Sequence, residues 1–507
     1  MTKTASTGPL DDLQRAERTD PDRVLLRWRG GSWTVRRFAA VARAVAAELS
    51  ASGLGPGDRV AIMSGNSART LAVTYGVWLA GAVEVAVNTE LRGPLLHHVL
   101  TDADPALVLA SADLLPTART ERPDLAFRAI EDLDLDRQDA VPSGPLPAPA
   151  DLASLLYTSG TTGPSKGVMI PHGYLAHYAG VLGDVLELTG DDVCYFSLPF
   201  FHVDAHIAVP TALRCGSTLA FAERFSVSRF WDDVEHFSAT WFGAVGSMLS
   251  ALATRPAPGP AVLERLRLVL AAPIPEDAYE FFEDGLGVPL LQMYGQTEAN
   301  GPIYSTLTSR RRGAMGLAHE DFEVRAAAAD GSTCPTGEVG ALQIRPRREH
   351  VLAQGYWRRP EATDQTFDGT WFATGDLAWQ DADGFWWYAG RATDSLRKRG
   401  ENVSAFEVEA VLRTAPDVRE AAIVAVRDEL GGEDDIKAVL VTDPGFDQAT
   451  FAAHCRDHLP RFARPRYLEL VEPDQLVRGP GTGAIQKHLL PQGLTSTTVD
   501  LDAVSAQ

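Results

Sequence analysis

The sequence predicts an α/β protein with a large N-terminal domain built on doubly wound sheets and a small C-terminal α/β domain. Three observations lead to this prediction. A chain of 507 residues is too long for one ordinary hydrophobic core. Strand-like and helix-like segments alternate from residue 12 to residue 110. A second alternation follows residue 390, so we place the large domain at 1–390 and the small one at 395–507.

The elements follow from hydrophobic spacing. A helix after Trp33 has apolar residues at helical intervals, and Arg59 to Met63 is predicted as a buried strand. The helix Ala68 to Ala80 and the strand Val83 to Val87 continue the alternation. Further strands are predicted at 241–245, 266–270, 421–426, 436–441 and 467–471, and further helices at 404–412 and 449–458. The tail from Pro491 to Gln507 lacks apolar periodicity, and we expect it to be disordered.

Composition limits the class of function. The formal net charge of −21 argues against nucleic-acid and anionic-membrane partners. The four cysteines are scattered without metal-ligand spacing, which argues against disulfides and structural zinc. Met1 to Asp11 lacks the apolar core of a signal peptide, and the most membrane-like segment, Leu71 to Val83, is shorter than the roughly 20 residues of a spanning helix. A cytoplasmic protein without a membrane span is therefore predicted.

The stretch from Leu156 to Gly167 brings hydroxyl residues and glycines together and ends near Lys166. Glycines let the backbone turn its N–H groups inward, hydroxyls donate hydrogen bonds, and the lysine adds a point charge, which together suit a polyphosphate. The predicted cradle residues are Thr158, Ser159, Gly160, Thr161, Thr162 and Lys166. The lysine is not placed as in a P-loop. A polar hairpin loop is the alternative that the stretch alone leaves open.

The segment from Leu198 to His206 combines aromatic residues with His202, Asp204 and His206. Such a cluster is often a packed corner of a core. The alternative is a pocket wall whose charge or polarity selects a polar substrate. The strand that begins at Trp241 is predicted to contribute its end to the same pocket.

The segment from Met293 to Glu298 reads as a strand that ends in a tight turn at Gly295. A carboxylate at Glu298 can hold Mg²⁺, with water and phosphate oxygens completing the octahedron. Thr297 can hydrogen-bond an α-phosphate, and Tyr294 can cover an adenine ring. A strand-ending turn without a ligand is the alternative.

These segments, in this order, resemble the adenylate-forming superfamily, which includes acyl-CoA synthetases, luciferases and the adenylation domains of peptide synthetases. The motifs that carry the resemblance are the phosphate loop, the LPFFH stretch, YGQTE at residues 294–298, TGD at 374–376 and GR at 390–391. They span nearly the whole chain. The LPFFHVDAH version looks closest to the crotonobetaine/carnitine–CoA ligase-like branch.

The resemblance implies further site residues. His202 lies beside the acyl pocket and the catalytic centre, and Gly295 lines the substrate site. On the nucleotide side the implied residues are Ala272 and Pro273 against adenine, Asp376 on the ribose hydroxyls as a strand-end carboxylate, and Arg391 on ribose and phosphate. Arg397 is implied to meet the phosphates of CoA and Gly400 to line the thiol tunnel. A hinge at 391–394 makes the small domain a mobile lid.

The last motif departs from the superfamily pattern. It reads Gly481-Thr482-Gly483-Ala484-Ile485-Gln486-Lys487, and Ala484 stands where a lysine usually bridges the acyl carboxylate and the α-phosphate. Losing one preorganised donor of this kind costs about 10²–10³ in rate. We hypothesise that Ala484 is an engineered substitution, with natural divergence as the alternative.

The expected function is therefore ATP-dependent adenylation of a small carboxylate, polar or aromatic, with Mg²⁺, followed by transfer of the acyl group to the thiol of CoA. Two alternatives stay open. One is a diazotase-type enzyme that adenylates nitrite and joins it to an arylamine. The other is a catalytically inactive nucleotide-binding protein, which the intact Lys166, Glu298, Asp376 and Arg391 disfavour. The oligomeric state stays open, with a homodimer as one expectation.

Overall fold

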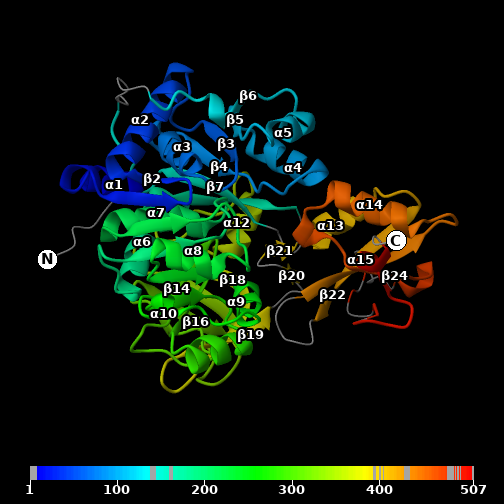
Figure 1. Cartoon of the computed structure of the whole chain (residues 1–507). Coiled ribbons are helices and arrows are strands. Elements are labelled where there is room, and N and C mark those ends of the chain that lie inside the picture. The colour runs from blue at the N-terminus through cyan, green and yellow to red at the C-terminus, as the bar shows by residue number, and fades with distance from the viewer. Residues whose placement is uncertain are drawn as a thin grey trace.

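The computed structural model describes residues 8–136, 144–158, 164–391, 396–398, 401–403, 405–427, 434–476, 485, 487, 490–491 and 493–504. Figure 1 shows a large N-terminal part, coloured blue to yellow, beside a smaller C-terminal part, coloured orange to red. Both parts combine sheets with helices, so the predicted α/β class, with a large and a small domain, is confirmed.

The first alternation of strands and helices forms a six-stranded sheet in the order β6-β5-β3-β4-β7-β8. Its neighbouring strands are parallel except for the hairpin-like pair β7–β8. The strands are β3 (Arg59–Met63), β4 (Val83–Ala86), β5 (Leu107–Ala110), β6 (Phe127–Ala129), β7 (Leu152–Thr158) and β8 (Lys166–Pro171). Because this sheet is parallel and covered by helices, its strands are short apolar runs with little exposure.

Helices α2 (Val35–Ala51), α3 (Ala68–Leu79), α4 (Gly93–Ala103) and α5 (Leu115–Glu121) accompany this sheet. Capping explains where two of them begin. The hydroxyl of Thr34 accepts the backbone N–H of Arg37 at the start of α2, and that of Ser67 accepts the N–H of Thr70 at the start of α3. The predicted helix after Trp33 and the predicted segments of β3, α3 and β4 therefore agree with the structure to within a residue or two.

A nine-stranded sheet, in the order β15-β14-β13-β12-β11-β9-β10-β1-β2, forms the second layer of the large part. The strands from β13 to β1 are parallel, and antiparallel strands close both edges. The strands are β1 (Val24–Trp28), β2 (Gly31–Thr34), β9 (Val193–Phe196), β10 (Thr218–Phe221), β11 (Trp241–Ala244), β12 (Leu268–Ala271), β13 (Leu290–Gln296), β14 (Ala299–Tyr304) and β15 (Leu317–Ala318). Its helices are α1 (Pro9–Thr19), α6 (His172–Val185), α7 (Val203–Cys215), α8 (Phe230–Phe237), α9 (Gly246–Ala253), α10 (Pro260–Leu263) and α11 (Glu276–Ala278).

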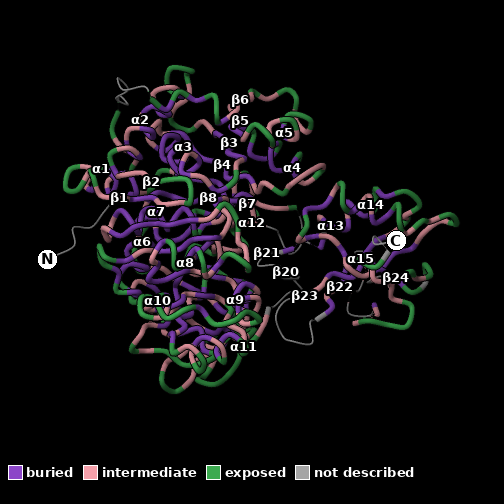
Figure 2. The backbone as a smooth tube through the Cα atoms, in the orientation of Figure 1, coloured by how far each residue is buried: buried purple, intermediate pink, exposed green. Residues whose placement is uncertain are grey.

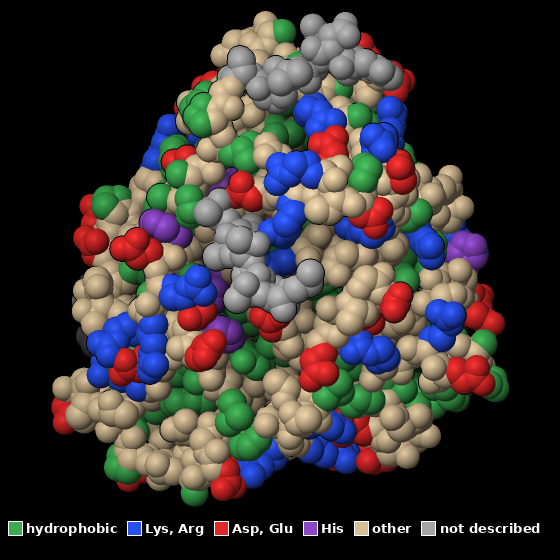
Figure 3. Space-filling model, turned by 90° about the vertical axis from the view of Figure 1, so that its left-hand side faces the viewer, with side chains coloured by type: hydrophobic (Ala, Val, Ile, Leu, Met, Phe, Trp, Pro, Cys, Tyr) green, Lys and Arg blue, Asp and Glu red, His purple; other side chains and the backbone are tan. Residues whose placement is uncertain are grey.

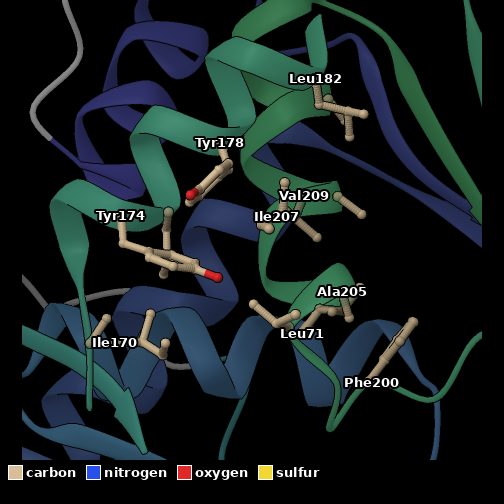
Figure 4. Close-up of a cluster of buried hydrophobic side chains, with 14 of the residues drawn as sticks. Leu71, Ile170, Tyr174, Tyr178, Leu182, Phe200, Ala205, Ile207 and Val209 are labelled. Carbon is tan, nitrogen blue, oxygen red and sulfur yellow. The ribbon is translucent and has the colours of Figure 1, made fainter. Parts of the chain in front are cut away.

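One hydrophobic cluster joins the two large sheets through α3, α6 and α7. Figure 4 shows how side chains from these helices meet: Tyr174, Tyr178 and Leu182 come from α6, and Ala205, Ile207 and Val209 from α7. Figure 2 shows the buried backbone running through the middle of the large part, with exposed segments at its rim. The helix α7 packs against this cluster along its length.

A third sheet, antiparallel and four-stranded, completes the large part. It consists of β16 (Phe322–Ala327), β17 (Gly340–Pro346), β18 (Phe372–Gln380) and β19 (Trp386–Arg391), with α12 (Pro360–Thr366) between β17 and β18. The strand β19 ends at Arg391, and residues 392–395 lie outside the described residues. The predicted hinge at 391–394 therefore stays a prediction.

The small part contains a two-stranded ladder, β20 (Leu396–Lys398) with β21 (Glu401–Val403), and a four-stranded sheet in the order β22-β23-β24-β25. The sheet strands are β22 (Val418–Arg427), β23 (Asp434–Thr442), β24 (Tyr467–Leu470) and β25 (Val499–Asp500). The helices are α13 (Ala405–Leu412), α14 (Gln448–His458) and α15 (Leu501–Val504). They enclose a hydrophobic cluster of their own.

The prediction that the tail from Pro491 onward is disordered was wrong for residues 493–504. The strand β25 pairs with β24, and Leu501 is buried. Polar contacts also fix this segment: the carbonyl of Gly493 accepts from the buried Nζ of Lys437 at 2.7 Å, and the Thr495 hydroxyl donates to Glu469 at 2.9 Å. Such contacts leave no hydrophobic period in the sequence, which is why the periodicity argument missed them.

On the face shown in Figure 3, basic and acidic side chains are interspersed. All four cysteines are free. Among the described helices, none is both long and apolar enough to cross a membrane.

Candidate functional site

A cavity of about 460 Å³ opens where the carboxyl ends of strands from two sheets converge. Its walls include the ends of β7, β9, β11 and β12, together with the β13–β14 turn and part of β18. Parallel sheets bind ligands at this edge, and the volume lies in the range of small-molecule sites. The predicted residues that line it are Thr158, Lys166, His202, Asp204, Trp241, Ala272, Gly295, Thr297 and Glu298.

One end of the cavity carries a lysine, a tyrosine and a carboxylate in contact. The Nζ of Lys166 lies 4.9 Å from the centre of the Tyr356 ring, and the Tyr356 hydroxyl donates to Oε1 of Glu298 at 2.8 Å. Burial raises the pKa of Tyr356 most, and the charge of Glu298 raises it further. The hydroxyl therefore keeps its proton and acts as a donor. This end of the cavity therefore combines one cation with one oriented carboxylate.

Tyr356 is a site residue to which the sequence analysis assigned no role. The segment around it runs beside β8: the N–H of Met169 donates to the carbonyl of Gly355, and the N–H of Trp357 donates to the carbonyl of Gly167. This backbone pairing brings Tyr356 to Lys166 from 190 positions along the chain. A lone tyrosine beside a glycine carries no sequence signal for such a contact.

Glu298 fits the Mg²⁺ role predicted for it. It sits in the turn between β13 and β14, is 7% exposed and lines the cavity. The turn is held on both sides, because the Tyr174 hydroxyl donates to the carbonyl of Thr297 at 2.9 Å and the N–H of Ala353 donates to the carbonyl of Glu298. A carboxylate oxygen in a fixed position is the kind of hard donor that Mg²⁺ prefers.

Tyr294 and Asp376 form a second polar unit beside the cavity. The Tyr294 hydroxyl donates to Oδ2 of Asp376 at 2.6 Å, and Gln296 Nε2 donates to the carbonyl of Thr374 at 3.1 Å. Both side chains are buried, and burial is the main reason that the pKa of Tyr294 is raised. Neither is among the described residues that line the cavity, although the neighbouring Gly375 is.

The expectation that Asp376 ends a strand was wrong. It lies in the middle of β18, directly opposite Arg391 of β19 in the antiparallel ladder. Gly375 has φ of +76°, and the β18–β19 register shifts between Leu377 and Ala378. The strand therefore bends at the carboxylate without ending there, a change that a TGD motif does not reveal.

Much of the remaining cavity wall is apolar. It is lined by aromatic and aliphatic side chains: Tyr178, Leu182, Phe196, Phe201, Ile207 and Trp241; Figure 4 shows three of them at the α6–α7 contact. His202 is the N-cap residue of α7, and Asp204 lies in the first turn of that helix, where the helix dipole favours a negative charge. The Nδ2 of Asn300 is 3.5 Å from Oδ1 of Asp204.

The placement of His206 in the substrate pocket was wrong. His206 is 5% exposed and is not among the described residues lining the large cavity, because its Nε2 is bonded to the buried carboxylate of Glu84 at 2.7 Å. It is a core residue behind the pocket wall, which agrees with the alternative that this segment is a packed corner of the core. Pro273 likewise lies outside the described lining residues, while Ala272 before it lines the cavity.

Several predicted residues cannot be placed. Ser159, Gly160, Thr161, Thr162, Gly400 and Ala484 lie outside the described residues. For Arg391 and Arg397 the described part is the backbone, in β19 and β20. Their predicted roles stay predictions.

A smaller cavity of about 90 Å³ lies between the large and small parts. It is lined by α4 on one side and by Val403, α13 and Phe462 on the other. Tyr157, Phe201 and His202 line both cavities and thus separate them. Beside it, the carboxylate of Glu407 in α13 accepts the backbone N–H of Ser165, and burial raises the pKa of Glu407.

Three side chains outside the cavity lie close enough together to be considered as a metal site. His177, His319 and Asp321 place ligand atoms within 4.8 Å of one another. However, Arg348 pairs with the Asp321 carboxylate at 3.2 Å, and Nδ1 of His319 accepts the N–H of Asp321. The proton of a neutral His319 then sits on Nε2. The group is therefore better explained as the ion pair between Arg348 and Asp321 than as a metal site.

Comparisons with known proteins agree with this geometry. The family model described as "AMP-binding enzyme" matches residues 13–357, and "AMP-binding enzyme C-terminal domain" matches residues 407–478. A sulfoacetate–CoA ligase from Cupriavidus necator is 30% identical over 477 residues, covering 90% of this chain and 92% of the relative. A crotonobetaine/carnitine–CoA ligase from Salmonella typhimurium is 29% identical over 444 residues, covering 82% and 86%.

Two structures of o-succinylbenzoate CoA synthetase from Bacillus subtilis show the same fold at 25% identity. A double mutant bound with the product analogue OSB-NCoA matches with a TM-score of 0.86, covering 94% of this chain and 98% of that chain. The complex with AMP matches with a TM-score of 0.71, covering 94% and 97%.

Proposed function

Because the chain belongs to the AMP-binding enzyme family, we propose a substrate class and residue roles for the two half-reactions of that family. The protein is an AMP-forming acid–thiol ligase. A carboxylate attacks ATP to give an acyl-adenylate and pyrophosphate, and the thiol of CoA then displaces AMP. The comparisons support neither the nitrite-activating alternative nor an inactive nucleotide-binding protein.

The charges on the cavity wall carry our proposal for the acid. Among the described lining residues, the groups that carry or can carry charge are Lys166, Glu298, His202 and Asp204. Lys166 and Glu298 suit ATP and its metal, which leaves for the acid a wall that is aromatic, aliphatic and, at Asp204, anionic. Such a wall favours a carboxylic acid with an apolar or aromatic body and an amino or ammonium group. It disfavours an acid with a second anionic group.

The relatives differ on this point. Sulfoacetate carries a sulfonate in addition to its carboxylate, whereas crotonobetaine and carnitine carry a quaternary ammonium group, and ligases for both kinds of acid are similar to this chain. Asp204 on the wall supports the second kind of chemistry. We place the substrate with the amine-bearing acids, and its aromatic character rests on Trp241, Phe196 and Phe201.

The roles of the polar residues follow from their positions. Lys166 supplies a positive charge for the ATP phosphates, and Thr297 lies in the same turn as Glu298 beside them. Glu298, oriented by Tyr356, would hold Mg²⁺, which when bound neutralises phosphate charge. Asp376 would accept the ribose hydroxyls, with Tyr294 fixing its carboxylate. In-line attack on phosphorus depends mainly on such positioning and charge stabilisation.

The domain arrangement supports a state suited to the second half-reaction. The same synthetase matches this chain better in its complex with a CoA product analogue than in its complex with AMP, at equal identity and coverage of this chain. The cavity between the two parts meets the acyl cavity at His202 and Phe201. A thiol entering from that side would reach the acyl end. We also place the enzyme in the cytoplasm and keep the homodimer as its proposed assembly.

The substrate proposal is tested with acids that share one ring. ATP–pyrophosphate exchange is measured with benzoate, 4-aminobenzoate and 4-sulfobenzoate, in this chain and in Asp204→Asn. We expect kcat/KM for 4-aminobenzoate to exceed kcat/KM for 4-sulfobenzoate by at least about tenfold, because the negative charges of Asp204 and the sulfonate repel each other. Asp204→Asn should narrow that ratio. A faster reaction with the sulfonate, or a ratio that Asp204→Asn leaves unchanged, would overturn the proposed substrate class.

A further inference from the structure

A buried ion pair lies behind the wall that carries His202. Glu84 of β4 is 2% exposed, and its carboxylate accepts three hydrogen bonds of 2.7 Å each: from the Thr74 hydroxyl of α3, the Ser154 hydroxyl of β7 and Nε2 of His206 in α7. The second ring nitrogen of His206, Nδ1, is 2.9 Å from the backbone carbonyl of His202. One chain of contacts thus runs from the six-stranded sheet to the N-cap of α7.

Both ring nitrogens of His206 face acceptors, which only the imidazolium form can satisfy with two donors. Burial lowers the pKa of His206, but the charge of Glu84 and the two hydrogen bonds outweigh it, and the pKa is raised. For Glu84, burial raises the pKa, and the pairing with His206 and the two hydroxyl donors lowers it further than burial lifts it. The pair is therefore ionised and fully hydrogen-bonded in the core.

The same wall is held at a second point. Asn66 donates from Nδ2 to the carbonyl of Leu198 at 2.8 Å, and its Oδ1 accepts the N–H of Phe200 at 2.9 Å. The segment from Leu198 to His202 is thus fixed from behind at its start by Asn66 and at its end by His206. Its front face carries Phe201 and His202, the residues that separate the two cavities.

We propose that Glu84 and His206 are positioning residues that hold His202 at the partition between the acyl cavity and the interdomain cavity. The inference rests on the proposed function only in that His202 must serve the reaction. A hydrogen-bonded charge buried in the core fixes a backbone carbonyl in one place, because any displacement leaves a buried donor or charge without its partner. A neutral, mobile side chain at residue 206 would let the N-cap of α7 shift.

The test is a double-mutant cycle between His206→Gln and His202→Ala, with 4-aminobenzoate as the acid. Gln keeps a donor for Glu84 and loses the donor for the carbonyl of His202. His206→Gln alone should lower kcat/KM for thioester formation about ten- to a hundredfold, because small displacements at a reacting group are costly, with the KM for ATP unchanged. In the His202→Ala background the same substitution should have no further effect.

Two further variants guard against misfolding. Glu84→Gln/His206→Gln removes both buried charges together and should stay folded. Thr74→Val removes one hydrogen bond to Glu84 without touching His206, so it should lower the melting temperature and leave kcat/KM as it is. Losses that add fully in the cycle would overturn the positioning role. Unchanged activity in His202→Ala beside a loss of activity in His206→Gln would overturn it too, because His202 would then not serve the reaction.

Discussion

Tyr356 is the residue on which the geometry of the phosphate end depends most. Its ring lies against Lys166 and its hydroxyl orients Glu298. Tyr356→Phe keeps the ring and removes one hydrogen bond to a carboxylate, worth about 1.5–3 kcal/mol. We expect ATP–pyrophosphate exchange to fall about tenfold or more, because the Glu298 carboxylate is no longer oriented. Tyr356→Leu, which also removes the ring, should fall further. Equal activity in all three proteins would contradict the role given to this contact.

At the scale of single residues, the sequence allowed prediction of the chemistry of the site better than its contacts. Lys166, Glu298, His202 and Asp204 line the cavity as expected because they belong to local motifs. His206 was misplaced, and Tyr356 was given no role. In both cases the deciding partner is more than 50 positions away: Glu84 for His206, and Lys166 with Glu298 for Tyr356. Local patterns do not contain such pairings.

The helix α6 makes the large domain sensitive to acid. His172 at its start is buried, its Nε2 has no hydrogen-bond partner among the described residues, and burial lowers its pKa to about 4. In the unfolded chain, His172 binds a proton near pH 6.5. The contribution of neutral His172 to the free energy of unfolding is therefore complete above about pH 6.5 and is lost as the pH falls toward 4. The loss is of order 3 kcal/mol for this group. His177 on the same helix acts in the same direction.

Urea unfolding of the protein and of His172→Phe at pH 7.5 and pH 5.0 measures this effect. Phenylalanine fills a similar space beside Trp78 and does not titrate. The difference in unfolding free energy between the two pH values should be smaller in His172→Phe than in the unaltered chain. If the unfolding free energy changed by the same amount between the two pH values in both proteins, the pKa of His172 would not be lowered in the folded protein.

At the scale of elements, predictability followed the source of stability. The strands β3 and β4 and the helices α2 and α3 are stabilised by packing of regularly spaced apolar residues. The bounds of β3, β4 and α3 and the start of α2 were predicted closely. The ordered tail that ends in β25 and α15 was not predicted, because the Lys437–Glu469 pair and backbone pairing with β24 hold it in place. Polar contacts of this kind have no period to detect.

For the whole molecule, the contact between Glu407 and Ser165 joins the small part to the large one beside the phosphate loop. If the structure represents the arrangement for thiol transfer, Glu407→Ala should slow thioester formation about tenfold, as expected for losing a hydrogen bond to a charged group. ATP–pyrophosphate exchange should not change. Glu407→Gln, which keeps an acceptor, should restore part of the loss. Slower exchange in Glu407→Ala would instead tie this contact to adenylation.

The central claim is that this chain forms an acyl-adenylate, and Ala484 provides the most direct test of it. ATP–pyrophosphate exchange is measured for the unaltered chain and for Ala484→Lys over aryl, enoyl and short-chain acids, with nitrite as a further substrate. We expect the lysine variant to exchange roughly a hundredfold faster with at least one acid, because one preorganised donor is restored. No exchange in either protein with any of these substrates would contradict adenylate formation.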